Sequence, residues 1–175
     1  TLDIYAPIAD RLGMNGIKSE LQDLGFANLY PWRHRTIAEH ISTVTGDRSE
    51  IITDIHKALK RKMNEAGIPC DIKGREKTPY SIYRKMQAKD LSFSEVNDVY
   101  GFRIITGPEG DCYRALGAIH QRWRAVPGRF KDYISQPKAN GYRSIHTSVS
   151  GRDGKRVEVQ IRTEEMHQVA ETGIA

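Results

Sequence analysis

The chain has 175 residues, of which 38% are hydrophobic and 28% charged, and its net charge is +5 at neutral pH. This length predicts one globular domain, or one domain with a fragment of a second. No apolar run is long enough to span a bilayer. The two cysteines, Cys70 and Cys112, form neither a disulfide framework nor a zinc motif. We therefore expect a cytoplasmic protein without a membrane segment.

The basic charge is concentrated in two segments. Residues 71–89 hold six Lys or Arg and two acidic residues, and residues 120–145 hold six and one. The remainder of the chain is therefore net negative. Concentrated positive charge favours an anionic ligand, although two solvated basic faces would give the same count.

The first 67 residues are predicted to be helical. Apolar residues recur at three- and four-residue spacing over residues 1–27, with interruptions at Pro7 and near Gly13. A short helix over 34–45 is followed by a stronger amphipathic helix, which ends near Gly67. We expect Asp47 or Ser49 to cap this stronger helix.

A strand over 68–72 and a basic turn over 73–77 are predicted next. Thr78 as N-cap and Pro79 at the first helical position predict a helix to about Lys89. A basic turn that leads into a helix N-terminus favours anion binding, because free N–H groups add to the side chains.

The sequence VYGFRII at 99–105 is typical of a buried strand. Arg103 lies inside it, and a charge in so apolar a strand must be paired, point into a cavity or reach water at a sheet edge. A strand that included Asp98 would place Asp98 and Arg103 on opposite faces. A helix from Asp111 to about Trp123 follows.

Two further strands, 142–149 and 157–162, are predicted to form a hairpin, and Thr163 to cap a closing helix. Alternation places Tyr142 and His146 on one face. In the second strand it places Glu158, Gln160 and Arg162 opposite the core-facing Val157, Val159 and Ile161.

These polar residues suit phosphoryl transfer. Asp98 and Glu158 would supply two carboxylates, and Mg²⁺ takes one or two carboxylates together with substrate phosphates. Lysines and arginines would neutralise the phosphates. Tyr142, with Asn140 and Lys138 beside it, offers a surface that can hold a nucleobase and its phosphate.

Five blocks of the sequence resemble the synthetase domain of RelA/SpoT-type (p)ppGpp synthetases, in the order and spacing of that family. They are 74–86 (GREKTPYSIYRKM), 97–105 (NDVYGFRII), 129–133 (RFKDY), 137–147 (PKANGYRSIHT) and 158–163 (EVQIRT). The stretch LDIYAPIADRL at 2–12 resembles the end of the hydrolase domain that precedes the synthetase in long members.

The resemblance implies an α+β fold, with a nucleotidyltransferase-like mixed sheet flanked by helices and preceded by a helical segment. It divides the chain into a helical remnant of the hydrolase domain over 1–32, a helical linker over 33–67 and the synthetase domain over 68–175. It also implies transfer of the β,γ-pyrophosphate of ATP to the 3′-hydroxyl of GDP or GTP, with release of AMP. Ribosome or tRNA contacts would belong to further domains of a longer chain.

The resemblance further implies roles for individual residues. The expected ATP-binding residues are Arg75, Lys77, Ser81, Lys85 and Arg103. The expected GDP- or GTP-binding residues are Lys131, Lys138, Asn140, Tyr142, His146 and Gln160. Asp98 and Glu158 would act in catalysis and bind Mg²⁺.

Two features of the sequence refine this expectation. Residues 129–132 have the basic form of a loop tetrapeptide that bears on the choice between GDP and GTP. The chain contains no His-Asp dipeptide, from which the family builds its hydrolase metal site, so we expect no hydrolase activity from this segment. Two alternatives are an RNA-binding module and a catalytically silent regulatory domain of the same family.

Overall fold

A computed structural model describes residues 1–96, 99–151 and 156–173 of the chain. Its α-helices are α1 Tyr5–Arg11, α2 Asn15–Leu29, α3 Pro31–Asp47, α4 Ser49–Glu65, α5 Pro79–Lys89, α6 Glu109–Arg122 and α7 Glu164–Thr172. Its strands are β1 Cys70–Glu76, β2 Tyr100–Thr106, β3 Arg124–Ala125, β4 Lys131–Asp132, β5 Ile145–Ser150 and β6 Arg156–Thr163, and a short 3₁₀ helix spans Phe93–Glu95.

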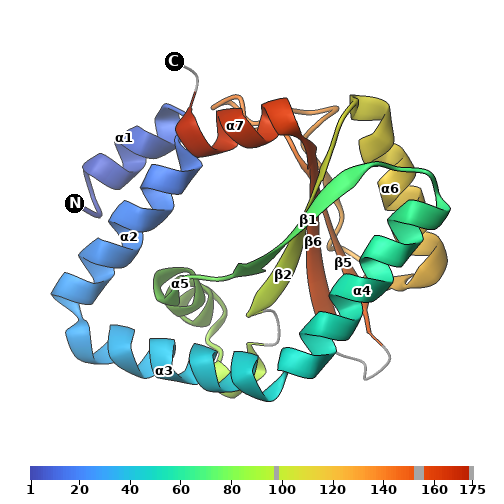
Figure 1. The fold of residues 1–175 in the computed structure, drawn as a ribbon. Coiled ribbons are helices and arrows are strands. Elements are labelled where there is room, and N and C mark those ends of the chain that lie inside the picture. The colour runs from blue at the N-terminus through green and yellow to red at the C-terminus, as the bar shows by residue number, and fades with distance from the viewer. Residues whose placement is uncertain (97–98, 152–155, 174–175) are drawn as a thin grey trace.

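The strands form one mixed sheet in the order β1-β2-β6-β5-β3, with β4 also paired to β5. Strands β2 and β6 are parallel, and the other pairs are antiparallel. Figure 1 shows α4 and α6 on one side of this sheet and α5 and α2 on the other. The predicted α+β class, with a mixed sheet flanked by helices, is confirmed.

The sheet has one apolar and one polar face. Alternation along β2 directs Phe102 and Ile104 to the same side as Val159 and Ile161 of β6, because Phe102 is in register with Val159. These side chains are almost fully buried and form the main core with α4 and α6. The intervening residues point to the opposite side, where the polar residues gather.

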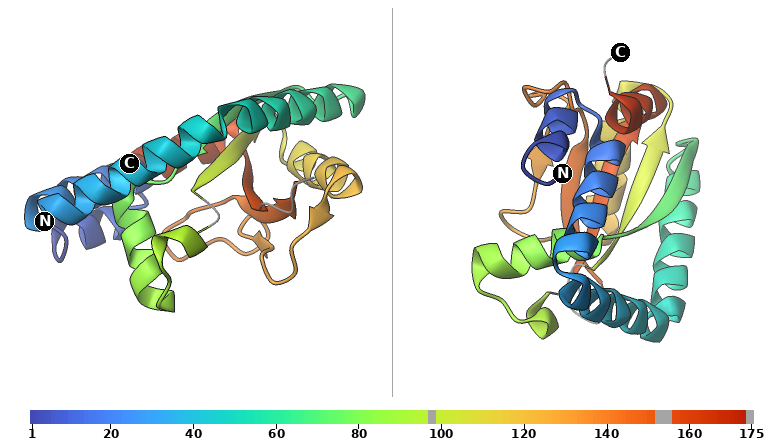
Figure 2. Two further views of the ribbon diagram at one scale, coloured as in Figure 1. Left: turned by 90° about the horizontal axis from the view of Figure 1, so that it is seen from below. Right: turned by 90° about the vertical axis from the view of Figure 1, so that its left-hand side faces the viewer.

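A second core joins the N-terminal helices to α5. Phe26 of α2 is fully buried and stacks on Tyr83 of α5, with 4.7 Å between the ring centroids. Ile37 of α3 and Ile82 of α5 pack in the same cluster. Figure 2 shows α3 and α4 in succession along one side of the molecule. The helical segment therefore shares buried surface with the residues that follow it.

Local signals at two helix starts are confirmed. Thr78 caps α5 by accepting a hydrogen bond from the backbone N–H of Ser81, and Pro79 occupies the first turn. Thr163 caps α7 by accepting one from the N–H of Met166. The cap expected for α4 is wrong: Arg48 holds the N-cap position and makes no side-chain cap bond.

Two predicted boundaries are also wrong. Residues 73–76 do not form a turn but continue β1, because their backbone pairs with β2 as far as Tyr100. The predicted strand 142–149 begins only at Ile145. The residues before it close into a loop, in which Lys138 N–H donates to the Tyr142 carbonyl at 3.2 Å.

Two other expectations concern the face of the sheet on which Asp98 lies and the composition of the helices. Strand β2 begins at Tyr100, after Asp98, which lies outside the described residues, so the alternation within β2 does not fix the face of Asp98. None of the described helices has the length and apolar composition that crossing a membrane requires.

The cap of α7 yields a stability prediction. Replacing Thr163 with Ala removes the acceptor for the Met166 N–H and should lower the free energy of unfolding by about 1 kcal/mol. Thr163→Ser keeps a hydroxyl acceptor and should lose less. Urea denaturation of the three proteins measures the difference. Equal losses in the two variants would show that the cap bond contributes nothing.

Candidate active site

The strand register arranges polar side chains in rows across the polar face. Arg103 of β2 is in register with Lys73 of β1 and Gln160 of β6. Gln160 in turn is in register with His146 of β5, which pairs with Lys131 of β4. Residues in register on adjacent strands project to the same side. Segments far apart in the sequence therefore meet on one surface.

The neighbouring row contains the central carboxylate. Glu158 is in register with Gly101, which is itself in register with Arg75. A Cβ at position 101 would lie 2.8 Å from the Glu158 carbonyl oxygen, so only glycine fits here. The absence of a side chain at position 101 therefore avoids a clash with the backbone of β6 at Glu158.

Glu158 forms an ion pair with Lys77, which directly follows β1. Lys77 Nζ lies 2.7 Å from Glu158 Oε2, and Gln160 Nε2 donates to Glu158 Oε1 at 3.3 Å. Burial acts to raise the pKa of Glu158, but Lys77, with smaller contributions from His146 and Gln160, lowers it below its ordinary value. The Lys77 backbone N–H donates to the Val99 carbonyl at 3.0 Å, which fixes the lysine beside β2.

A groove of about 780 Å³ opens beside this ion pair, and we call it the basic groove. Its cationic lining comes from α5, from the loops around β4 and from the strands. These cations are Lys77, Lys85, Lys89, Arg129, Lys131, Lys138 and Arg156. Glu95 and Glu158 are its acidic residues among those described. So many cations in one concave surface suit a polyphosphate.

A second cavity, of about 460 Å³, adjoins the groove, and we call it the arginine pocket. Arg75, Arg103, Arg162, Tyr142 and Gln160 line it from the sheet side. Helix α2 closes it from outside with Asn15, Gly16, Ser19 and Glu20. Lys138 and His146 line both cavities. Gln160, which lines this pocket, has a buried Oε1 without a hydrogen-bond partner among the described residues.

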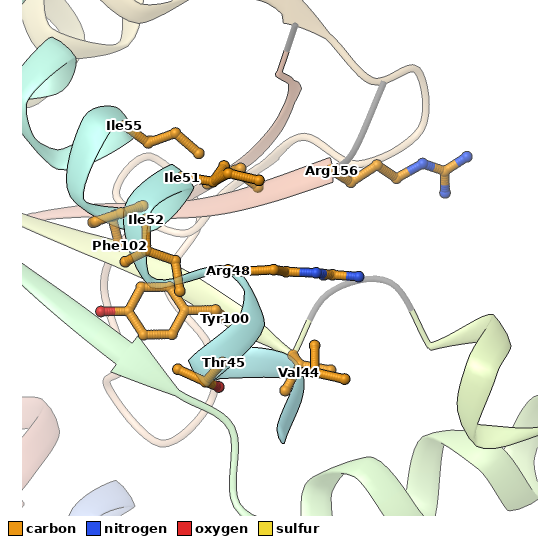
Figure 3. A pocket seen from close by; sticks show the side chains of 11 residues that line it. Val44, Thr45, Arg48, Ile51, Ile52, Ile55, Tyr100, Phe102 and Arg156 are labelled. Atoms are coloured by element: carbon orange, nitrogen blue, oxygen red, sulfur yellow. The ribbon is translucent and has the colours of Figure 1, made fainter. Parts of the chain in front are cut away.

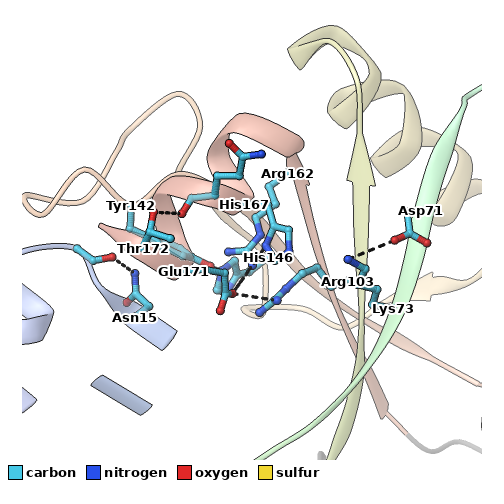
Figure 4. A network of polar contacts seen from close by, with 12 residues as sticks. Asn15, Asp71, Lys73, Arg103, Tyr142, His146, Arg162, His167, Glu171 and Thr172 are labelled. Atoms are coloured by element: carbon cyan, nitrogen blue, oxygen red, sulfur yellow. Dashed lines mark hydrogen bonds and ion pairs between the residues drawn. The ribbon is translucent and has the colours of Figure 1, made fainter. Parts of the chain in front are cut away.

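Glu171 of α7 holds two arginines of the arginine pocket in place (Figure 4). Its Oε1 lies 3.1 Å from both Arg103 Nη1 and Arg162 Nη2, and Arg162 Nη2 also donates to His167 Nδ1 at 2.7 Å. Burial, together with repulsion from Arg162, lowers the pKa of Arg103 to about 10. Two guanidinium groups therefore share one carboxylate at the edge of the pocket.

Aromatic contacts organise the boundary between the two cavities. The Tyr142 hydroxyl and His146 Nε2 are 2.8 Å apart, and Lys138 Nζ lies 5.1 Å from the Tyr142 ring centroid. The Tyr133 ring packs edge-on against both Tyr142 and His146. Burial, and then the nearby cations, lower the pKa of His146 to about 4 despite the opposite effect of Glu158. The imidazole is therefore neutral at physiological pH.

The structure places most of the predicted site residues on one side of the sheet. The basic groove receives Lys77, Lys85, Lys131, Lys138, His146 and Glu158. The arginine pocket receives Arg75, Arg103, Tyr142 and Gln160, so residues expected for two different nucleotides line the same cavity.

Three predicted residues lie elsewhere. Ser81 is exposed on α5, where its hydroxyl contacts Thr78 at 3.0 Å, and it lines neither cavity. Asn140 lines neither cavity and makes its contacts inside the protein. Asp98 lies outside the described residues.

Sequence reasoning missed several residues that line or support the site. Alternation had placed Arg162 on the polar face, but a fully buried arginine was not foreseen there. Its partners His167 and Glu171 lie on α7, and nothing in the helical pattern indicated that they face the sheet. Lys89, which also lines the basic groove, was counted only within the basic segment 71–89, and Arg156 was not singled out.

The apolar face contains a different kind of cavity, of about 40 Å³, between the α3–α4 junction and β2 (Figure 3). Isoleucines of α4 line it opposite Tyr100 and Phe102. Arg48 and Arg156 reach its edge, and no carboxylate lines it among the described residues. It is a gap in the core rather than a site for phosphate chemistry.

Comparison with known proteins places these features in a family. Residues 74–175 match a family model described as a region found in RelA / SpoT proteins. Over its full length the chain is 51% identical to the bifunctional (p)ppGpp synthase/hydrolase SpoT of Escherichia coli strain K12. It is 45% identical to the GTP pyrophosphokinase rsh of Brucella melitensis. It spans 25% and 23% of the lengths of these two relatives.

Solved structures of small alarmone synthetases from Bacillus subtilis have a similar fold. Synthetase 1, bound to its product pppGpp, matches with a TM-score of 0.59 and 25% identity over 74% of this chain and 75% of that one. Synthetase 2 matches with a TM-score of 0.56 and 26% identity over 76% of this chain and 75% of that one.

The lowered pKa of His146 predicts a pH dependence of stability. The unfolded chain takes up a proton on this residue near pH 6.5, whereas the folded chain does so only near pH 4. Stability should therefore fall as the pH is lowered through this window, by about 2 kcal/mol between pH 7 and pH 5. His146→Gln should remove this part of the loss. Urea denaturation of both proteins at the two pH values measures it, and an identical loss in the variant would refute the assignment.

Proposed function

The chain belongs to the RelA/SpoT family, and we propose that it synthesises (p)ppGpp. In this reaction the β,γ-pyrophosphate of ATP is transferred to the 3′-hydroxyl of GDP or GTP, and AMP is released. The names of its relatives support (p)ppGpp metabolism, with both synthase and hydrolase activities among them. The two solved structures compared above are those of small alarmone synthetases, which supports the synthetic direction.

One observation carries the proposal: two cavities meet at Lys138 and His146, beside the Lys77–Glu158 ion pair. Transfer between two nucleotides requires room for two bases and a shared region for phosphates. The basic groove supplies cations for the phosphates. The arginine pocket supplies flat guanidinium groups and a tyrosine, which stack on bases.

In the proposed assignment, Lys77 and Lys85 contact the ATP phosphates in the basic groove, and Arg75 and Arg103 hold adenine. The acceptor nucleotide is held by the residues around the boundary of the two cavities. These are Lys131, Lys138, Tyr142, His146 and Gln160. Because Tyr142 and Gln160 share the arginine pocket with the two arginines, the two bases would lie close together.

The Lys77–Glu158 pair suggests how the acceptor hydroxyl is activated. A triphosphate in the basic groove competes with Glu158 for Lys77. Once Lys77 pairs with a phosphate, the effect of burial remains and raises the pKa of Glu158. Glu158 then accepts the proton of the 3′-hydroxyl, the hydroxyl oxygen bonds to the β-phosphorus of ATP, and the bond between the α–β bridging oxygen and the β-phosphorus breaks.

The residues present are compatible with Mg²⁺. The described part of the chain contains no group of three or more metal-ligating side chains. Mg²⁺ requires only one or two carboxylates when substrate phosphates complete its shell, and Glu158 faces the basic groove. We therefore propose that Glu158, together with Asp98, holds a cation that arrives with the nucleotide. When bound, Mg²⁺ would neutralise charge on the transferred phosphates.

A direct assay tests this function. Incubation with ATP, GDP and Mg²⁺ should yield AMP together with a guanosine product that carries a 3′-diphosphate, resolved by anion-exchange chromatography. Glu158→Gln keeps the shape of the side chain but removes the base, and should lower kcat by at least about a hundredfold.

Glu165→Gln is the matched control, because Glu165 is exposed on α7 and lines neither cavity. It should retain the activity of the unmodified chain. An unchanged kcat in Glu158→Gln would refute the role of that carboxylate. The absence of product, both from this chain and from a longer chain that contains it, would refute synthesis.

A further inference from the structure

The turn between α1 and α2, together with the ends of both helices, forms a unit that we call the α1–α2 corner, residues 10–16. The side chain of Asn140 binds to it. Asn140 Nδ2 donates to the backbone carbonyl of Asp10 at 2.9 Å and lies 3.5 Å from Asp10 Oδ1. At the other end of the same amide, Asn140 Oδ1 accepts a hydrogen bond from the Tyr142 N–H at 3.2 Å.

Both bonds have a clear physical cause. Asp10 lies in the last turn of α1, where its carbonyl accepts a hydrogen bond from the Gly13 N–H at 3.1 Å. The Asn140 amide supplies a second donor to this carbonyl, which has two lone pairs. The oxygen of the same amide fixes the backbone of Tyr142, inside a loop that is closed by the bond between Gly141 N–H and the Lys138 carbonyl at 2.9 Å. Asn140 therefore connects the α1–α2 corner to the loop that carries Tyr142.

The corner also packs against this loop without intervening space. Gly13 adopts a φ of +75°, and a Cβ at this position would lie 2.9 Å from the backbone oxygen of Asn140. Both the backbone conformation and the contact require glycine. A larger residue would have to move the loop or the corner.

The opposite end of the corner contacts the carboxylate that holds Arg103. A Cβ at Gly16 would lie 3.0 Å from Glu171 Oε2, and Glu171 Oε1 is the atom that pairs with Arg103. Figure 1 shows the corner beside α7, and Figure 4 shows Asn15 beside the same network. The corner thus contacts the supports of both Tyr142 and Arg103, which lie on two sides of the arginine pocket.

We propose that the α1–α2 corner is a positioning element of the nucleotide site, and that Asn140 is a positioning residue rather than a nucleotide ligand. This inference rests on the proposed function and extends it to residues outside the matched region 74–175. Without the corner, the loop with Tyr142 would be free to move, and a nucleotide would lose affinity by having to order it.

Three variants separate positioning from direct contact. Gly13→Ala displaces the loop without altering any side chain of the pocket. Asn140→Asp keeps an acceptor for the Tyr142 N–H but puts a second carboxylate oxygen in place of the amide that donates to the Asp10 carbonyl. The substitution does not change the size of the side chain. Gly67→Ala is the control, because Gly67 also has a positive φ, of +62°, but open space around it.

The measurements are the dissociation constant of a fluorescent guanine nucleotide and the kinetics of synthesis. Gly13→Ala and Asn140→Asp should each raise the dissociation constant and the KM for the acceptor about three- to tenfold, with kcat at saturation unchanged. Amide hydrogen exchange at Tyr142 should be faster in both variants. Gly67→Ala should behave as the unmodified chain in all three measurements.

The other outcomes overturn the inference. If only Asn140→Asp weakens binding, Asn140 contacts the nucleotide directly. If Gly13→Ala and Gly67→Ala weaken it equally, the effect is general strain. If exchange at Tyr142 accelerates but affinity is unchanged, the corner does not position the site. A chain that neither binds the nucleotide nor forms product would instead refute the proposed function, and the inference with it.

Discussion

The ion pair between Glu158 and Lys77 is the interaction on which the polar side of this molecule depends. A carboxylate with only 22% of its side chain exposed is costly unless a cation compensates it. Glu158 lies on strand β6, and Lys77 directly follows β1, which is on the other side of β2 in the sheet. Three strands must therefore pair in register before this charge is neutralised. In the proposed reaction, the basicity of this carboxylate rises when phosphates attract Lys77.

The two faces of the sheet have different roles: one builds the hydrophobic core, and the other carries the polar residues of the candidate site. On one side, Phe102, Val159 and Ile161 build a core with α4 and α6, and a small gap lies within it. On the other, the strand register aligns cations and one carboxylate into two adjoining cavities. The ion pairs of Glu171 contribute to both stability and the site. They neutralise the buried Arg162, and they also orient Arg103.

The parts that the sequence could predict are those with local or periodic signals. Alternation identified the polar face of β6, and the Thr78 cap marked the start of α5. The basic run after Ile72 was wrongly predicted as a turn, because its composition suits solvent whereas its backbone pairs with β2. The contact of Asn140 with Asp10 joins residues 130 positions apart, and no local pattern encodes it. Contacts between residues far apart in the chain determine both features. The same kind of contact places the helical segment beside the site.

The central claim is that the two adjoining cavities together hold two nucleotides at once around one carboxylate. Equilibrium titration of a fluorescent guanine nucleotide, with and without a saturating non-hydrolysable ATP analogue, tests this most directly. We expect one equivalent of each nucleotide to bind at the same time, with the affinity for the guanine nucleotide retained or increased by the analogue. Displacement of the guanine nucleotide by the ATP analogue would mean that both compete for one cavity, and would contradict the account.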